Sequence, residues 1–207
     1  MTPTRWRALN LGLMFLCLSL VFFTSCAKQP TAPDKPKFTD GRLSGGAYIN
    51  DVIGMDIPIP KNWVARLSTA QRRQDTLSAL LVEFLSPDSS GPFRTSINVV
   101  AGATKATSMN CEAQAQALQQ QFSSDSSWSK LTFSPADQVL IGGLYACDTR
   151  FMGDFASGAH SVQHVAIRQS VLLRENYVVA FTLADSTGGF NAHCAMMDTL
   201  FQNVVLH

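Results

Sequence analysis

The chain has 207 residues, 46% of them hydrophobic, which is enough for one domain with a sizeable core. Sixteen lysine and arginine residues against 15 acidic ones give a formal net charge of +1. The sequence contains no block of five or more like charges and no basic cluster, so nucleic acid is not an expected partner.

The first 25 residues have the features of an export signal. Arg5 and Arg7 form a short positive region, and residues 11–23 are an almost unbroken apolar run. A helix needs roughly 20 apolar residues to cross a bilayer core, so this run is too short for a stable span. A charged start, a short apolar core and small residues after it indicate a signal peptide at residues 1–25. A buried helix or an uncleaved anchor is the alternative.

The sequence Phe23-Thr24-Ser25-Cys26 resembles the lipobox of bacterial lipoproteins, with Phe in place of the usual Leu. The resemblance implies cleavage before Cys26, a diacylglyceryl thioether on its sulfur and acylation of its new amino group. Two or more acyl chains anchor a protein stably. Ala27, where inner-membrane lipoproteins carry Asp, implies an outer-membrane location facing the periplasm. An ordinary secreted protein with a chance cysteine is the alternative.

Residues 26–46 are expected to be the lipidated N-terminus and a flexible tether. The segment contains Pro30, Pro33 and Pro36 and ends in Leu43-Ser44-Gly45-Gly46. Such a composition buries too little apolar area to fold, and it behaves as a semi-extended linker. Residues 47–207 are therefore predicted to form a single folded domain.

After residue 46 the sequence consists of short apolar or alternating runs separated by Gly, Pro, Ser and Asp, which is typical of strands and turns. Val162–Leu173 and Tyr177–Leu183 are predicted to form a hairpin around residues 174–176. The other predicted strands are Ala47–Val52, Met55–Pro58, Trp63–Leu67, Leu77–Leu85, Phe93–Ala101, Leu131–Phe133, Val139–Ile141, Leu144–Met152 and Asn203–Leu206.

Two segments have helical periodicity, Cys111–Phe122 and Phe190–Phe201. In each, four apolar residues fall at i, i+4, i+7 and i+11, which makes one apolar stripe. Asn110 is a suitable N-cap for the first helix. The order strands, helix, strands, helix, strand predicts an α+β domain with a mainly antiparallel sheet flanked by helices.

Three cysteines belong to the domain: Cys111, Cys147 and Cys194. An exported compartment permits disulfides, and an odd number allows at most one internal bridge. Their spacing matches no zinc or redox motif. Cys111 and Cys194 fall on the apolar stripes of the two helices, so all three could be small buried hydrophobic residues. A bridge between Cys147 and one of the other two is the second alternative, and the sequence does not choose the pair.

The opening of the domain resembles the PsbP-like and DcrB-like family. The resemblance is carried by Ala47-Tyr48-Ile49-Asn50, by the segment from Gly54 to Pro60 with Trp63 after it, and by the C-terminal hairpin, helix and closing strand at residues 204–206. It implies a PsbP-like α/β/α sandwich. It implies no shared chemistry, because such domains serve as extrinsic assembly subunits and as envelope lipoproteins, and fold alone does not carry function.

No catalytic motif is present: the sequence lacks a Gly-x-Ser-x-Gly elbow, a P-loop, a dinucleotide fingerprint and His-Glu-x-x-His. His160 and His164 on a strand would lie ~13 Å apart, so no metal site is expected. His193 and Cys194 are neighbours on a helix and point about 100° apart, so they cannot form a base–nucleophile pair. Asp148 and Arg150 share a strand face and are expected to form a surface ion pair.

One loop invites a binding role. The segment Phe151–Gly158 places aromatic residues beside glycine and could present Phe151 and Phe155 to a partner. The alternative, which we favour, is a strand end whose aromatic side chains lie in the core.

These observations favour a non-enzymatic, envelope-anchored accessory or binding module. Its expected partners are the membrane, through the lipid on Cys26, and possible envelope proteins, and no cofactor other than that lipid is expected. An envelope hydrolase without a recognisable motif is the alternative. A deep pocket with two convergent polar groups of shifted pKa would favour the hydrolase, and a shallow surface with an exposed apolar patch would favour the binding module.

The Cys26→Ala substitution tests the lipid anchor. It is expected to abolish labelling with a fatty-acid probe and to release or mislocalise the protein, because the thiol is the group that accepts the lipid. Metabolic labelling followed by membrane fractionation measures both effects. Continued labelling of the variant would refute lipidation at this position.

Overall fold

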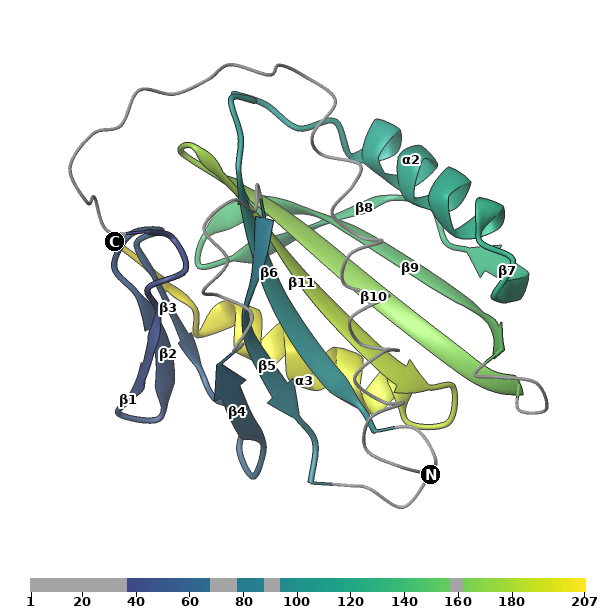
Figure 1. The fold of residues 1–207 in the computed structure, drawn as a ribbon, viewed down its shortest axis with the longest axis horizontal. Helices are drawn as coiled ribbons and strands as arrows, with labels where there is room; N and C mark the ends of the chain where they lie inside the picture. Colours follow the sequence, from purple (N-terminus) through teal and green to yellow (C-terminus); the bar gives the residue numbers. More distant parts are fainter. Residues whose placement is uncertain (1–36, 68–77, 88–93, 157–161) are drawn as a thin grey trace.

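The computed structural model of the chain describes residues 37–67, 78–87, 94–156 and 162–207 (Figure 1). Several predictions lie outside these ranges: the signal peptide, Cys26, the first part of the tether, the starts of two predicted strands at Leu77 and Phe93, His160 and residues 157–158. Within the ranges, neither helix has the length and apolar character needed to span a bilayer.

In the part of the chain that the structure describes, the fold consists of two antiparallel sheets and two helices (Figure 1). The small sheet has the order β1 (Arg42–Ser44), β2 (Ala47–Asn50), β3 (Met55–Pro58), β12 (Val205–Leu206). The large sheet has the order β4 (Val64–Leu67), β5 (Ser78–Leu85), β6 (Ser96–Ala103), β11 (Tyr177–Ser186), β10 (Val162–Arg174), β9 (Leu144–Ala156), β7 (Trp128–Phe133), and β8 (Asp137–Ile141) also pairs with β9. The helices are α2 (Cys111–Ser124) and α3 (Phe190–Gln202). The predicted α+β class with a mainly antiparallel sheet is confirmed.

The long strands at the centre of the large sheet follow from their sequence. Eight of the 13 residues of β10 and eight of the ten residues of β11 are buried, so the middle of each strand is covered on both faces. The hairpin between them pairs Arg174 with Tyr177, so its loop is the two residues Glu175 and Asn176. Glu175 has a φ of 49°, which is the left-handed conformation that such tight turns require.

The two helices cover opposite faces of the large sheet. On β9, Phe151 packs with Leu118 and Phe122 of α2. Ala146, on the other face, belongs to the core that contains the apolar side of α3. The layers are therefore helix, sheet and helix. The predicted cap of helix α2 is present as well. The Asn110 side chain accepts a hydrogen bond from the backbone N–H of Ala113.

The predicted tether boundary at residue 46 is corrected by the structure. Arg42–Ser44 form strand β1, which pairs with β2, so the folded part includes residues assigned to the linker. The two glycines that indicated flexibility form the turn of this hairpin. Gly45 and Gly46 have φ values of 58° and 80°, and two consecutive positive φ angles are what the favoured two-residue hairpin turn demands.

The Tyr-x-Asn sequence of β2 has a direct physical explanation. Tyr48 is fully buried, and its hydroxyl accepts a hydrogen bond of 2.9 Å from the side-chain amide of Asn50. The Asn50 Oδ1 atom accepts from the backbone N–H groups of Val52 and Ile53, and the Nδ2 atom also donates to the carbonyl oxygen of Phe38. One asparagine therefore fixes the turn after β2 and holds the start of the described chain against it.

Tyr48 makes the stability of the fold sensitive to alkaline pH. Burial raises the pKa of Tyr48 to about 12, against 10.0 ordinarily, and the hydrogen bond with Asn50 offsets part of that shift. Between pH 10 and 12 the unfolded chain loses this proton while the folded chain keeps it, so the free energy of unfolding should fall by roughly 2–3 kcal/mol over that window.

The variant Tyr48→Phe should show a shallower fall in the free energy of unfolding between pH 10 and 12, measured by urea denaturation at each pH. It should also lose about 1 kcal/mol at neutral pH, because the Asn50 amide loses an acceptor. Tyr145→Phe is the matched control, since the Tyr145 side chain is 73% exposed, and it should keep the wild-type slope. Equal slopes in wild type and Tyr48→Phe would contradict the prediction.

Candidate functional site

A disulfide joins the two sides of the candidate site. Cys111, the first residue of α2, is bonded to Cys147 on β9, with their Cα atoms 5.1 Å apart. Cys194 is free and buried on α3. Of the alternatives left open by the sequence, the structure therefore has the bridge between Cys147 and Cys111, and Cys194 is the small buried hydrophobic residue.

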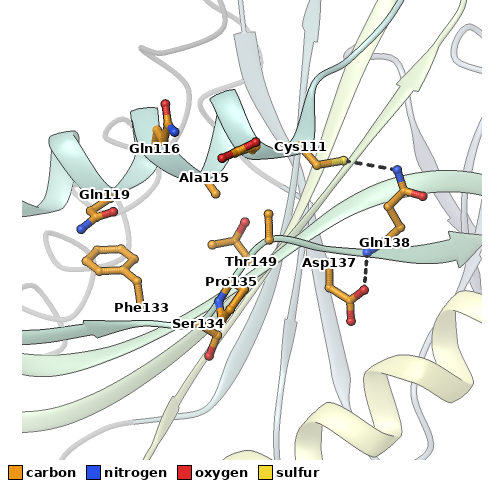
Figure 2. A pocket seen from close by; sticks show the side chains of 12 residues that line it. Cys111, Ala115, Gln116, Gln119, Phe133, Ser134, Pro135, Asp137, Gln138 and Thr149 are labelled. Atoms are coloured by element: carbon orange, nitrogen blue, oxygen red, sulfur yellow. Dashed lines mark hydrogen bonds between the residues drawn. The ribbon is translucent and has the colours of Figure 1, made fainter.

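An open pocket of about 680 Å³ lies beside this disulfide (Figure 2). One wall is the first two turns of α2, and the other is the connection between β7 and β8, with Thr149 of β9 between them. The lining residues are Cys111, Glu112, Ala115, Gln116, Gln119, Phe133, Ser134, Pro135, Ala136, Asp137, Gln138 and Thr149.

The pocket lining supplies hydrogen-bonding groups and no positive charge. The lining contains three carboxamides, two hydroxyls and two carboxylates. They belong to Gln116, Gln119, Gln138, Ser134, Thr149, Glu112 and Asp137. The Gln138 backbone N–H donates to Asp137 Oδ1 at 2.7 Å, so that carboxylate is already engaged. A lining of this kind suits a neutral polar or cationic ligand and disfavours a phosphate or another anion.

A cluster of packed aromatic rings lies beside the pocket, and Phe133 belongs to both. Phe133 stacks on Phe151 with ring centroids 5.1 Å apart, and Phe122 of α2 lies 4.3 Å from the same ring. Phe151 is 2% exposed, and Phe155 packs partly buried against the same cluster. The interpretation of these rings as core residues is confirmed, and the alternative in which Phe151 meets a partner is wrong.

A row of polar side chains continues from the pocket across the sheet. Thr149 pairs in register with Gln169 on β10, which pairs with Thr182 on β11, which pairs with Asn98 on β6. All four are buried, and the Gln169 amide donates to the Thr182 hydroxyl at 3.3 Å. The Asn98 Oδ1 atom is buried without a hydrogen-bond partner. This row places polar atoms inside a face that is otherwise apolar.

The expected surface ion pair at Asp148 is buried instead. Arg150 does approach Asp148 at 3.3 Å, but Asp148 is 1% exposed and its main partner is Arg168, which is fully buried. The Arg168 Nε atom donates to both carboxylate oxygens, at 2.9 and 3.1 Å. Burial lowers the pKa of the Arg168 guanidinium, but hydrogen bonds and charges from Asp148 and Asp198 outweigh burial and raise it. The charge is therefore kept in the core.

His193 and Cys194 do not form a catalytic pair. The His193 Nδ1 atom lies 2.6 Å from Asp185 Oδ2, and the imidazole packs edge-on against Trp63. Burial raises the pKa of the Cys194 thiol, which is opposite to the change that a nucleophilic thiolate needs. Gly189 leaves room for the Asp185–His193 contact, because a Cβ there would lie 2.9 Å from Asp185 Oδ2.

His164, one of the two histidines considered for a metal site, lies beside a carboxylate. His164 contacts Asp154, and Lys130 reaches the same carboxylate at 2.9 Å. Lys130 and His164 together hold the pKa of Asp154 below its usual range, against the effect of burial. Among the residues with described placement, no three His, Cys, Asp or Glu side chains are grouped for a metal ion.

Exposed apolar residues lie next to the pocket, at the β8–β9 turn. Leu140 pairs with Tyr145 in register, and their side chains are 52% and 73% exposed. Two residues further along the same two strands, Gln138 of the pocket lining pairs with Cys147. Leu140 and Tyr145 therefore continue the surface on which the pocket lies. Gly142 and Gly143 form the turn between these two strands, and no sequence pattern connected Leu140 with Tyr145.

The pocket itself was also missed at the sequence level. Its glutamines on α2 lie outside the predicted apolar stripe of that helix, and residues 134–136 lie between two predicted strands. A bridge between Cys147 and Cys111 was one of the pairings left open, and that pairing would have placed α2 over the β7–β8 connection.

No protein-family model matches the chain, and no curated protein matches it in sequence. Solved structures match its fold. Cyanobacterial PsbP (CyanoP) from Synechocystis sp. PCC 6803 superimposes with a TM-score of 0.54 at 12% identity, over 81% of this chain and 99% of CyanoP. LpqN, involved in cell envelope biogenesis of Mycobacterium tuberculosis, gives 0.48 at 11% identity, over 73% of this chain and 82% of LpqN. The similarity to CyanoP shows that the chain has a PsbP-like fold.

Reduction of the disulfide should destabilise the domain. The bridge closes a loop across a sequence separation of 36 residues, for which loop-closure entropy corresponds to about 4 kcal/mol. Cys111→Ala/Cys147→Ala, or dithiothreitol acting on the wild type, should lower the free energy of unfolding by about 2–4 kcal/mol in urea denaturation. Cys194→Ala is the control and should keep the full response to dithiothreitol. An unchanged midpoint after reduction would show that the bridge does not support the fold.

Proposed function

We propose that the chain is a membrane-anchored lipoprotein of the cell envelope that works as a non-enzymatic accessory module by binding an envelope partner. The partner is expected to present an extended, polar protein segment to the pocket beside the Cys111–Cys147 disulfide. The placement proposed is the outer membrane, facing the periplasm.

Two independent features support the envelope. The first is the order of charged start, short apolar run and lipobox-like sequence ending in Cys26. The second is the disulfide, because such bonds persist in oxidising compartments and are rare in the cytosol. Ala27 supports the outer membrane through the resemblance to lipoprotein sorting signals.

The observation that carries the binding role is the lining of the pocket. Carboxamides, hydroxyls and carboxylates can donate to and accept from a peptide backbone and polar side chains, and no histidine or free thiol stands among the lining residues. The pocket is open, and the exposed apolar pair Leu140 and Tyr145 adjoins it. Together these features favour recognition of a macromolecular surface.

The hydrolase alternative has one observation in its favour, which is the Asp185–His193 contact. A buried carboxylate that orients a histidine is an arrangement that general bases use. The His193 imidazole contacts Asp185 through Nδ1 and packs edge-on against Trp63. Neither His193 nor Asp185 lines the pocket, so the two features do not combine into one site.

Site-specific crosslinking tests the binding role. A photoreactive phenylalanine analogue at Gln119, on the pocket wall, should capture an envelope protein from intact cells that carry the full-length lipidated protein. The same analogue at Thr199, on the exposed side of α3, is the control and should capture none at that level. The captured protein is identified by mass spectrometry.

A pocket-filling variant makes the test quantitative. Ala136→Trp places an indole in the pocket, and crosslinking at residue 119 should fall at least about tenfold, which corresponds to about 1.4 kcal/mol of binding free energy. Ala106→Trp, an exposed alanine in another irregular segment, should leave crosslinking unchanged. No captured partner, combined with turnover of an envelope substrate that His193→Ala abolishes, would replace this proposal with the hydrolase.

A further inference from the structure

Four exposed apolar side chains gather at one end of the domain. Leu140, Leu144 and Tyr145 flank the β8–β9 turn, and Val205 lies on β12. Their exposed fractions are 52%, 40%, 73% and 52% in that order, although exposed strand positions in antiparallel sheets are normally polar. We call these four residues the apolar tip.

The β8–β9 turn and β12 are held together in the fold. The Gly142 backbone N–H donates to the carbonyl oxygen of Phe201, and a Cβ on Gly142 would lie 2.8 Å from Leu206 Cγ. Gly142 and Gly143 have φ values of 56° and 86°, so the turn is a tight two-residue turn between Ile141 and Leu144. The apolar tip is therefore a fixed part of the surface and not the end of a long loop.

The chain enters the domain at the same end. Phe38 packs against Tyr177 at a ring distance of 5.7 Å, and Tyr177 directly follows the β10–β11 turn. β10 runs beside β9 as far as the pair Leu172 and Ala146, so this turn lies next to the start of β9. The small sheet and the C-terminus lie at this end as well (Figure 1).

We propose that the apolar tip docks on the surface of the lipid bilayer to which Cys26 is attached. This inference rests on the lipid anchor of the proposed function. The 11 residue steps from Cys26 to Lys37 span at most roughly 40 Å. The anchor therefore holds this end of the domain close to the headgroups, where even a weak apolar contact is favoured by high effective concentration.

The side chains of the tip match the chemistry of a bilayer interface. Leucine side chains can enter the boundary of the acyl chains, and tyrosine places an apolar ring there with its hydroxyl among the headgroups. The four tip residues carry no charge, and the nearby Arg42 pairs with Asp51. Contact through the tip should therefore require no anionic lipid and should persist in high salt.

The test uses the full-length lipidated protein in phosphatidylcholine vesicles. A nitrobenzoxadiazole fluorophore is attached at Leu144→Cys in a Cys194→Ala background, which leaves Leu140 and Tyr145 in place. The matched control carries the fluorophore at Val162→Cys, because Val162 is 63% exposed and lies at the opposite end of β10. Co-flotation with the vesicles reports the anchor, and quenching by spin-labelled lipid reports contact of the tip.

We expect at least threefold stronger quenching at residue 144 than at residue 162, unchanged in 1 M NaCl. Adding Leu140→Ser and Tyr145→Ser to the residue-144 variant should reduce quenching to the control level while the protein still floats with the vesicles. Equal quenching at both positions in floating protein would overturn the docking proposal and leave the anchor intact. Quenching that appears only after addition of envelope proteins would assign the tip to a protein partner instead. Failure to float would refute the anchor, and the docking proposal with it.

Discussion

A fully buried guanidinium, Arg168, holds the large sheet to helix α3. Its Nε atom donates to both oxygens of Asp148 on the neighbouring strand, and its Nη1 atom reaches Asp198 and the carbonyl oxygen of Cys194 on the helix. Removing one partner of a buried ion pair typically costs 3–5 kcal/mol, because the other charge is left without compensation. The position of β9, and with it the Cys147 half of the disulfide, depends on this network. The guanidinium also lies over the ring of Phe201, 5.5 Å from its centroid, so the charge and the apolar core are packed together.

β9 is fixed from both of its faces, and this places the candidate site. Arg168 and Asp148 hold the strand to α3 on one face, and the Cys111–Cys147 bridge holds it to α2 on the other. The pocket opens on the second face, between α2 and the connection that runs from β7 to β8 along the edge of β9. A site built between two fixed elements is preorganised for a ligand, which reduces the ordering cost of binding. The same strand also carries Tyr145 of the apolar tip, so one strand joins the pocket to the proposed membrane contact.

Much of the fold could be predicted from local patterns, and the exceptions have physical causes. The α3 stripe and the Asn110 cap depend only on helical periodicity and on hydrogen bonding over three residues, and both are observed. Of the predicted α2 stripe, Leu118 and Phe122 are buried, whereas Cys111 and Ala115 line the pocket. Met55–Pro58 was predicted at its observed bounds because Gly54 and Pro58 mark its ends. The Gly45–Gly46 turn was misread because two glycines suit a linker and a tight hairpin equally. Asp148 was misread because its partner, Arg168, is 20 residues away in sequence, and pairings of that kind are set by the packing of the whole sheet. The pocket depends on the same long-range packing.

The disulfide at the start of α2 has a consequence for the export that we propose for this chain. Before export, cysteine thiols are kept reduced, so the precursor would lack the bond that fastens α2 to β9. A chain without that bond unfolds more easily, and an unfolded chain is what a protein-conducting channel of the general secretory type accepts. On the far side of the membrane, oxidation would close the bond and raise the barrier to unfolding. The same pair of cysteines would thus keep the precursor fit for translocation and lock the mature domain once it has crossed.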